Sequence, residues 1–148
     1  MISDWILSFC LALNCYMAGT EWITQLVSFP MLALVGTDSF SQYHAAIMKR
    51  IILPIAVPGL LTLILSMLLI WLTPLGIPSW SVWLLLILQV IPILSTVFIQ
   101  LPKHNKLTEK GFDEVIIASL VQSQWLRTIS VTFSALLLVW MIVLAIYQ

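Results

Sequence analysis

The amino-acid sequence predicts an all-α protein, a four-helix transmembrane bundle that forms a single membrane domain over residues 1–148. Hydrophobic residues make up 61% of the chain and charged residues only 8%, whereas a soluble domain carries about 25% charged residues. The mean hydropathy is +1.11. These values exclude a soluble globular domain and a disordered tail. Six basic residues balance six acidic ones, so no positive surplus is left for phosphates, and we expect no nucleic-acid partner.

The gaps between charged residues set the expected spans. One membrane-spanning helix needs about 20 apolar residues, and the uncharged stretch from Ile51 to Pro102 is long enough for two. Residues 73–79, in the middle of that stretch, are rich in Pro and Gly and predict a turn. We therefore expect four transmembrane helices, over about residues 5–28, 51–72, 79–101 and 124–147.

The connections carry their own signals. Pro30 is expected to end or kink the first helix, because proline disfavours helix at the residue before it. Thr37 or Asp38 is expected to cap a helix that leads into the second span. Residues 103–111 are expected to form an aqueous loop. By its charge, Asp113 suits the start of a helix that continues unbroken to the C-terminus.

The basic residues predict the orientation in the membrane. All six lie in or beside the segments 29–50 and 102–123, and the termini carry none: Lys49, Arg50, Lys103, Lys106, Lys110 and Arg127. By the positive-inside rule, these two segments face the cytoplasm and both termini lie outside, in a multi-pass protein of the inner (cell) membrane. Tryptophans at the other side are expected to form an aromatic belt: Trp5, Trp71, Trp80 and Trp83. The N-terminus has no basic residue and no clear cleavage pattern, so we expect the first helix to stay in the mature protein.

Each expected span carries polar residues on one face, spaced by the helical period. These stripes are Asn14, Glu21 and Gln25; His44, Gly59, Thr62 and Ser66; Gln89, Thr96 and Gln100; and Ser119, Ser123, Arg127, Ser130 and Ser134. Lipid contact is costly for polar groups, so the four stripes are expected to face one another. The small Ser, Thr and Gly residues are typical of helix–helix contacts in membranes.

The ionisable residues within the spans leave two interpretations open. At about 1.5 Å per residue, Glu21 lies about 24 Å into the first helix, at a level that Arg127 can share. The two side chains can form a structural ion pair. Alternatively, they belong to a pocket near the cytoplasmic face that binds a polar head group or moves a proton.

The only two histidines, His44 and His104, lie on the same side of the membrane as that pocket. Either can act as a general base on a bound molecule, or be an ordinary interfacial residue. Together with Glu21 they would make a two-histidine, one-carboxylate set, which suits non-haem iron. No local spacing motif supports such a site, so we predict no metal ligands and leave the cofactor open.

Three stretches resemble a known family. The first runs from Glu21-Trp22 to Phe29-Pro30 and continues to Phe40-x-x-x-His44. The second is residues 96–107, and the third is residues 124–128. In this order the chain resembles the anthrone-oxygenase-like family of small four-helix membrane proteins. Some fungal relatives add oxygen to a polycyclic aromatic anthrone, so the resemblance implies an oxygenase or oxidoreductase. It points to His44, His104, Asn105, Trp125 and Arg127 as site residues.

These observations give one leading hypothesis and two alternatives. A small apolar, aromatic or quinone-like molecule would enter from the bilayer, His44 or His104 would act as the catalytic base, and Arg127 with Asn105 would stabilise an oxyanion. The expected substrate-binding residues are Glu21, Trp22, Gln25, Gln100, Asn105, Trp125 and Arg127. Alternatively, the protein is a non-catalytic bundle that binds a lipid, a quinone or a partner subunit, or a small transporter or proton path. An oligomer is compatible with each hypothesis.

Overall fold

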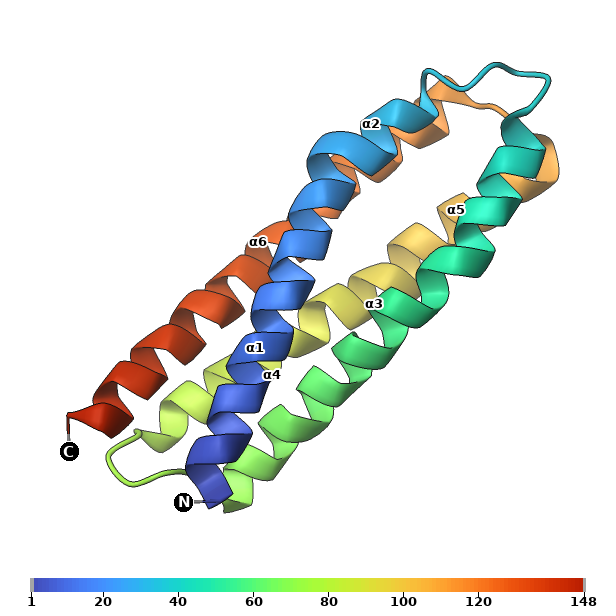
Figure 1. The fold of residues 1–148 in the computed structure, drawn as a ribbon. Helices are drawn as coiled ribbons and strands as arrows, with labels where there is room; N and C mark the ends of the chain where they lie inside the picture. Colours follow the sequence, from blue (N-terminus) through green and yellow to red (C-terminus); the bar gives the residue numbers. More distant parts are fainter. Residues whose placement is uncertain (1, 148) are drawn as a thin grey trace.

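The computed structural model describes residues 2–147, which form four long antiparallel helical rods joined by short connections (Figure 1). The rods are built as follows: α1 (Ile2–Ile23), a π-helical turn (Thr24–Ser28) and α2 (Phe29–Leu32); α3 (Phe40–Trp71); α4 (Ser79–Ser95), a second π-helical turn (Thr96–Gln100) and α5 (Leu101–Lys110); and α6 (Glu114–Ile146). Each rod is long and apolar enough to cross a membrane. The predicted all-α, multi-pass architecture is therefore confirmed, and the two termini lie at the same end of the bundle.

The rods are longer than the predicted spans. They contain 31 to 33 residues, or about 46–50 Å of helix, whereas the hydrocarbon core of a bilayer is about 30 Å thick. The bundle therefore has room for an end section beyond the hydrocarbon. The expected helix through residues 39–50 into α3 and the unbroken α6 are both confirmed. The expected loop over residues 103–111 is wrong, because α5 is helical to Lys110 and buries Leu107 completely.

In the first and third rods, a π-helical turn lies just before a proline, and the helix continues beyond that proline. The Phe29 N–H donates to the Thr24 carbonyl, and the Leu101 N–H donates to the Thr96 carbonyl, each across five residues. A proline follows each turn, at positions 30 and 102. Because a π turn holds one extra residue, it widens the helix just where a proline ring would crowd the preceding carbonyls. The first rod therefore continues past Pro30 to Leu32 and does not end before it.

The helix starts are set by local chemistry. Asp113 caps α6, since its carboxylate accepts a hydrogen bond from the Ile116 N–H at 3.0 Å, as expected from its charge and position. The expected cap at Thr37 or Asp38 is wrong. These two side chains contact each other at 3.4 Å, and α3 starts after Ser39 without a side-chain cap.

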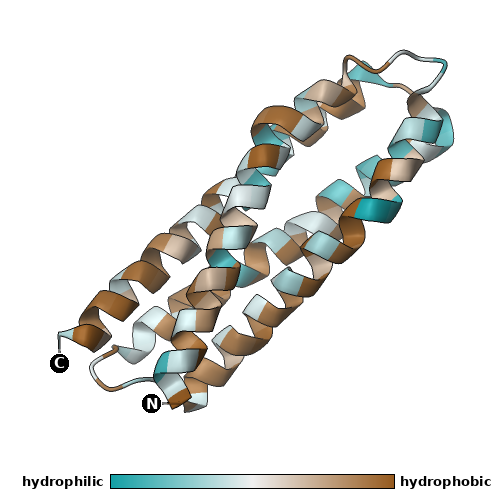
Figure 2. Cartoon of the chain, in the orientation of Figure 1, coloured by the Kyte–Doolittle hydropathy of each residue, from teal (hydrophilic) through white to brown (hydrophobic). Residues whose placement is uncertain are grey.

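The interior has an apolar cluster at each end and a polar section between them. The cluster near the termini contains Leu7, Cys10, Leu69, Ile77, Val82, Leu85, Leu138 and Met141. The other cluster lies at the opposite end, called the loop end here, where residues 33–39 and 111–113 connect the helices. It contains Phe29, Leu32, Phe40, Leu107, Ile117 and Leu120. Most other large apolar side chains are exposed on the outside of the bundle, the surface that lipid would cover. Figure 2 shows hydrophilic residues gathering toward the loop end.

A proline inside α3 creates one further contact between helices. Pro58 has no N–H, so the carbonyl of Pro54 loses its usual helical donor. The Tyr16 hydroxyl of α1 donates a hydrogen bond to that carbonyl at 3.2 Å. This hydrogen bond gives the Pro54 carbonyl a partner, so that it does not lie unpaired in apolar surroundings.

Candidate functional site

A buried polar cluster joins three rods in the middle section of the bundle. The Glu21 carboxylate accepts hydrogen bonds from the Arg127 guanidinium, at 2.6 Å, and from the Gln124 side-chain amide. The Gln124 side-chain oxygen accepts one from the Gln100 Nε2 atom at 2.8 Å. All four residues are buried. The pairing of Glu21 with Arg127, which the sequence left open, is thus present in the structure.

The cluster also contains polar atoms that lack a hydrogen-bond partner among residues 2–147. These atoms are the Gln25 Oε1, the Gln100 Oε1 and the Arg127 Nε. The amide nitrogen of Gln25, by contrast, donates to the Val121 carbonyl at 3.2 Å. A buried polar group without a partner costs about 1–3 kcal/mol. Two free acceptors and one free donor in one cluster therefore favour the binding of water or of a small polar group.

The two histidines lie against each other at the loop end of this cluster. His44 Nε2 and His104 Nδ1 are 3.0 Å apart, and the rings stack with their centres 5.2 Å apart. The other nitrogen of His44, Nδ1, is 3.1 Å from the Thr108 hydroxyl. Gln100 and His104 are one turn apart on the third rod, so that rod links the histidine pair to the Glu21 cluster.

The contacts of the Thr108 hydroxyl favour one arrangement of the ring protons. The Thr108 hydroxyl donates its single proton to the His104 carbonyl at 3.0 Å, so toward His44 it can only accept. His44 then carries its proton on Nδ1 and accepts at Nε2, and the donor to that atom is the His104 Nδ1–H. The assignment leaves the lone pair of His104 Nε2 free. The chain Thr108–His44–His104 thereby orients His104 as a base.

Aromatic rings enclose the histidine pair. Phe40 stacks on His44 with ring centres 5.7 Å apart, and Phe29 meets His104 edge-on at 5.5 Å. Phe112 packs edge-on against Phe40. His44 is 1% exposed and His104 is 8% exposed. Aromatic rings beside the two imidazoles favour the binding of flat, apolar molecules.

Most of the predicted site residues come together, but three do not. Glu21, Gln25, His44, Gln100, His104 and Arg127 are all buried in the inner half of the bundle toward the loops. Asn105 is exposed on α5, because it follows His104 and therefore points away from the buried face. The exposed position does not support the expected role of Asn105 in stabilising an oxyanion beside that ring.

The two tryptophans lie at the outer surface of the bundle. Trp22 and Trp125 are 39% and 40% exposed and meet edge-on, with ring centres 5.7 Å apart. Trp22 also donates a hydrogen bond to the Thr132 hydroxyl at 3.1 Å. Each tryptophan directly follows a buried polar residue, Glu21 or Gln124, and one helical step turns it about 100° away from the interior. The expected stacking of these rings on an enclosed ligand is therefore not supported.

The two-histidine, one-carboxylate set does not form. Among residues 2–147, no group of three His, Cys, Asp or Glu side chains is close enough to hold a metal ion. Glu21 pairs with Arg127 and Gln124, and the histidines pair with each other. The carboxylate and the imidazoles thus belong to two separate groups along the bundle.

Some important residues were absent from the sequence-based set. Gln124 lies three positions before Arg127, so the helical period places both on one face. Thr108 lies four positions after His104, which also places them on one face. Lys103 donates to the Ser119 carbonyl and to the Ser123 hydroxyl, at 2.9 and 3.1 Å, and so fastens α5 to α6. Helical spacing alone could have identified the first two residues.

Comparisons of the chain with protein-family models, with curated proteins and with solved structures find no match.

Proposed function

We propose that this protein is a membrane-embedded enzyme of the oxygenase or oxidoreductase type, in which His104 takes a proton from a small apolar molecule that is aromatic or quinone-like. The observation that carries this proposal is the hydrogen-bonded chain Thr108–His44–His104, which leaves His104 Nε2 as a free acceptor inside an aromatic wall. The resemblance to the anthrone-oxygenase-like family suggests the substrate class.

The chemistry would begin with proton transfer. His104 Nε2 would take a proton from an acidic methylene group of the substrate, and the electron pair would stay on carbon. The buried Arg127 guanidinium, whose Nε–H has no partner among the described residues, would stabilise the negative charge that develops on the substrate oxygen. His44 would hold the ring of His104 in position through the 3.0 Å contact.

Molecular oxygen would then be the oxidant. The carbanion would be oxidised by O₂ and, after taking back the proton, would become a hydroperoxide. The O–O bond would break with loss of water to give a ketone. The balance is R₂CH₂ + O₂ → R₂CO + H₂O, so the reaction needs no further reductant. The chain's own residues supply the base, its orientation and the anion stabilisation.

A second candidate function is non-catalytic binding. The unpaired polar atoms of Gln25, Gln100 and Arg127 favour a bound polar head group, because each of them lacks a hydrogen-bond partner among the described residues. In that case the protein would hold a lipid or quinone, and the histidine pair would be structural.

The test uses purified protein in nanodiscs with anthrone as the probe. We expect wild-type protein to consume anthrone and O₂ in equal amounts. His104→Asn keeps an N–H donor toward His44 but lacks the free acceptor, so the rate should fall at least about 100-fold. Asn105→Ala changes the neighbouring exposed residue and serves as the matched control. Its rate should equal that of the wild type.

Three other results would decide between the two candidate functions or exclude both. Turnover that survives in His104→Asn at full thermal stability would overturn the assignment of the base. Tight anthrone or quinone binding without O₂ uptake would support the second candidate. Neither binding nor turnover of either probe would overturn both functions.

We also propose that both termini face the outside of the cell membrane. The support is that all six basic residues lie in the half of the bundle near the loops, while both chain ends lie at the opposite end. This distribution follows the positive-inside rule.

A further inference from the structure

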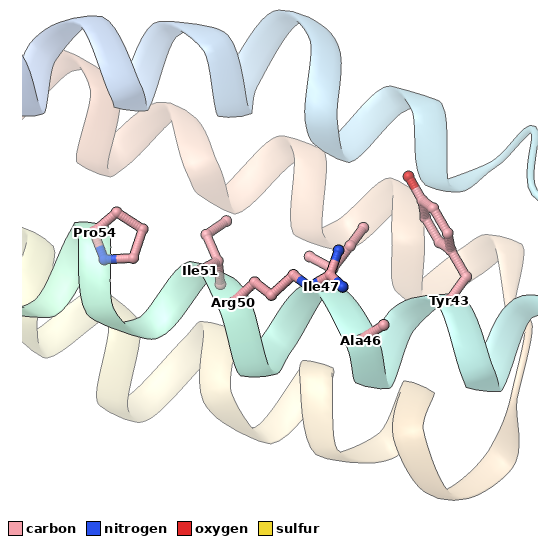
Figure 3. Close-up of a pocket in the computed structure, with 6 residues that line it drawn as sticks. All are labelled: Tyr43, Ala46, Ile47, Arg50, Ile51 and Pro54. Atoms are coloured by element: carbon pink, nitrogen blue, oxygen red, sulfur yellow. The ribbon is translucent and has the colours of Figure 1, made fainter.

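The side of α3 that turns toward α1 and α2 carries a hollow that the proposed reaction does not use. Its volume is about 380 Å³, and Figure 3 shows the side chains that line it: Tyr43, Ala46, Ile47, Arg50, Ile51 and Pro54. These positions recur every three or four residues, so they form one continuous face of the helix. The volume of the hollow is within the size range of small-molecule sites, about 300–1,000 Å³.

The hollow is apolar except for one positively charged side chain and the Tyr43 hydroxyl. Arg50 is exposed, and no carboxylate among the described residues forms an ion pair with it; the recorded side-chain pair is Glu21 with Arg127. Its side chain runs along α3 beside Ile47 (Figure 3). Asp38 and Glu109, exposed acids of the loop end, form no recorded ion pair with it. The charge of Arg50 is therefore available to a partner from outside the chain.

The hollow spans the boundary between hydrocarbon and head groups. Arg50 lies 21 positions before Trp71, or about 32 Å along α3, which matches the roughly 30 Å of bilayer hydrocarbon. With Trp71 at one boundary, Arg50 lies at the other. Ile51 and Pro54 then lie just inside the hydrocarbon, and Tyr43 lies among the head groups. A ligand for this site needs a negative head next to an apolar tail.

From this combination we propose that the α3 hollow binds an anionic phospholipid, with its phosphate on Arg50 and an acyl chain against Ile51 and Pro54. Basic pockets on the cytoplasmic side of membrane helices commonly select acidic head groups. A second copy of this chain is a poorer occupant, because a symmetric contact would place one Arg50 against the other. The proposal is independent of the oxygenase function, since none of the lining residues belongs to the histidine pair or the Glu21 cluster.

The test is native mass spectrometry of the full chain, titrated in detergent with phosphatidylglycerol or phosphatidylcholine. We expect one phosphatidylglycerol to bind in preference to phosphatidylcholine. Arg50→Gln should weaken it about fivefold or more, the usual contribution of one basic residue at a membrane surface. Lys49→Gln is the matched control, because it removes the same charge from the neighbouring exposed position outside the hollow. It should have a clearly smaller effect.

A second pair of variants keeps every charge. Ala46→Phe fills the hollow, so it should weaken phosphatidylglycerol binding, whereas Ile52→Phe adds bulk on an exposed residue outside the hollow and should not. Equal losses in Arg50→Gln and Lys49→Gln would indicate general surface attraction and overturn the site. So would unchanged binding in Ala46→Phe, equal binding of the two lipids, or dimerisation that excludes lipid.

Discussion

Removing the charge of Glu21 tests whether the central ion pair holds the bundle together. Glu21 is 1% exposed and lies 2.6 Å from Arg127. Two opposite charges at that distance attract by about 6 kcal/mol at an effective dielectric constant of about 20, and the lost hydration of the ions offsets most of it. The larger effect is the cost of one buried charge without its partner, about 3–5 kcal/mol. In Glu21→Gln, moreover, one carboxylate oxygen becomes an amide donor that must face Arg127 or Gln124, both of which are donors.

The assay is thermal unfolding of the purified variants in one detergent. A loss of 3–5 kcal/mol corresponds to a decrease in Tm of about 10 °C for a chain of this length. Arg127→Met should destabilise by a similar amount, because it leaves the Glu21 carboxylate unpaired. The double variant should recover most of the loss, with a coupling of about 2 kcal/mol or more in the double-mutant cycle. Glu109→Gln, a change at an exposed carboxylate, should alter stability by less than about 0.5 kcal/mol.

Two results would contradict a structural role for the ion pair: unfolding of Glu21→Gln within about 2 °C of the wild type, or additive effects of the two single changes in the double variant. Either result would mean that the ion pair contributes little to the packing of α1 against α6. If Glu21→Gln were less stable but still bound a ligand fully, the Glu21–Arg127 pair would have a structural role that is separate from the chemistry at the histidines.

Three further outcomes follow from single contacts. Tyr16→Phe removes the donor to the Pro54 carbonyl and should lower stability by about 1 kcal/mol, measured by the same thermal assay. Asp113→Ala removes the α6 cap and should cost about 1 kcal/mol, while Asp113→Asn should restore most of it. In a cysteine-free background, a membrane-impermeant maleimide should label Ser3→Cys and not Glu109→Cys in intact cells. The reverse pattern would invert the proposed orientation.

The sequence by itself determines the class and the number of spans. Charged residues are so sparse that the long apolar stretches predict the spans, and the Pro-Gly turn at residues 73–79 separates the second span from the third. The period of the polar stripes also predicts which faces turn inward: Glu21, Gln25 and Gln100 are buried as expected. These features depend on single residues or on the helical period, because each residue contributes separately to the free energy of partition into a bilayer.

Which polar groups contact one another depends on how the helices pack. From the sequence, Glu21 could pair either with Arg127 or with the histidines. In the structure, α1 packs against α6, and Glu21 therefore contacts Arg127 and Gln124. The histidine pair forms because α3 and α5 are both helical well beyond the predicted spans, and α5 was expected to be a loop. Helical periodicity fixes the direction of a side chain around its own axis. It does not fix the axial offset between helices, which depends on π turns, prolines and the packing of the whole bundle.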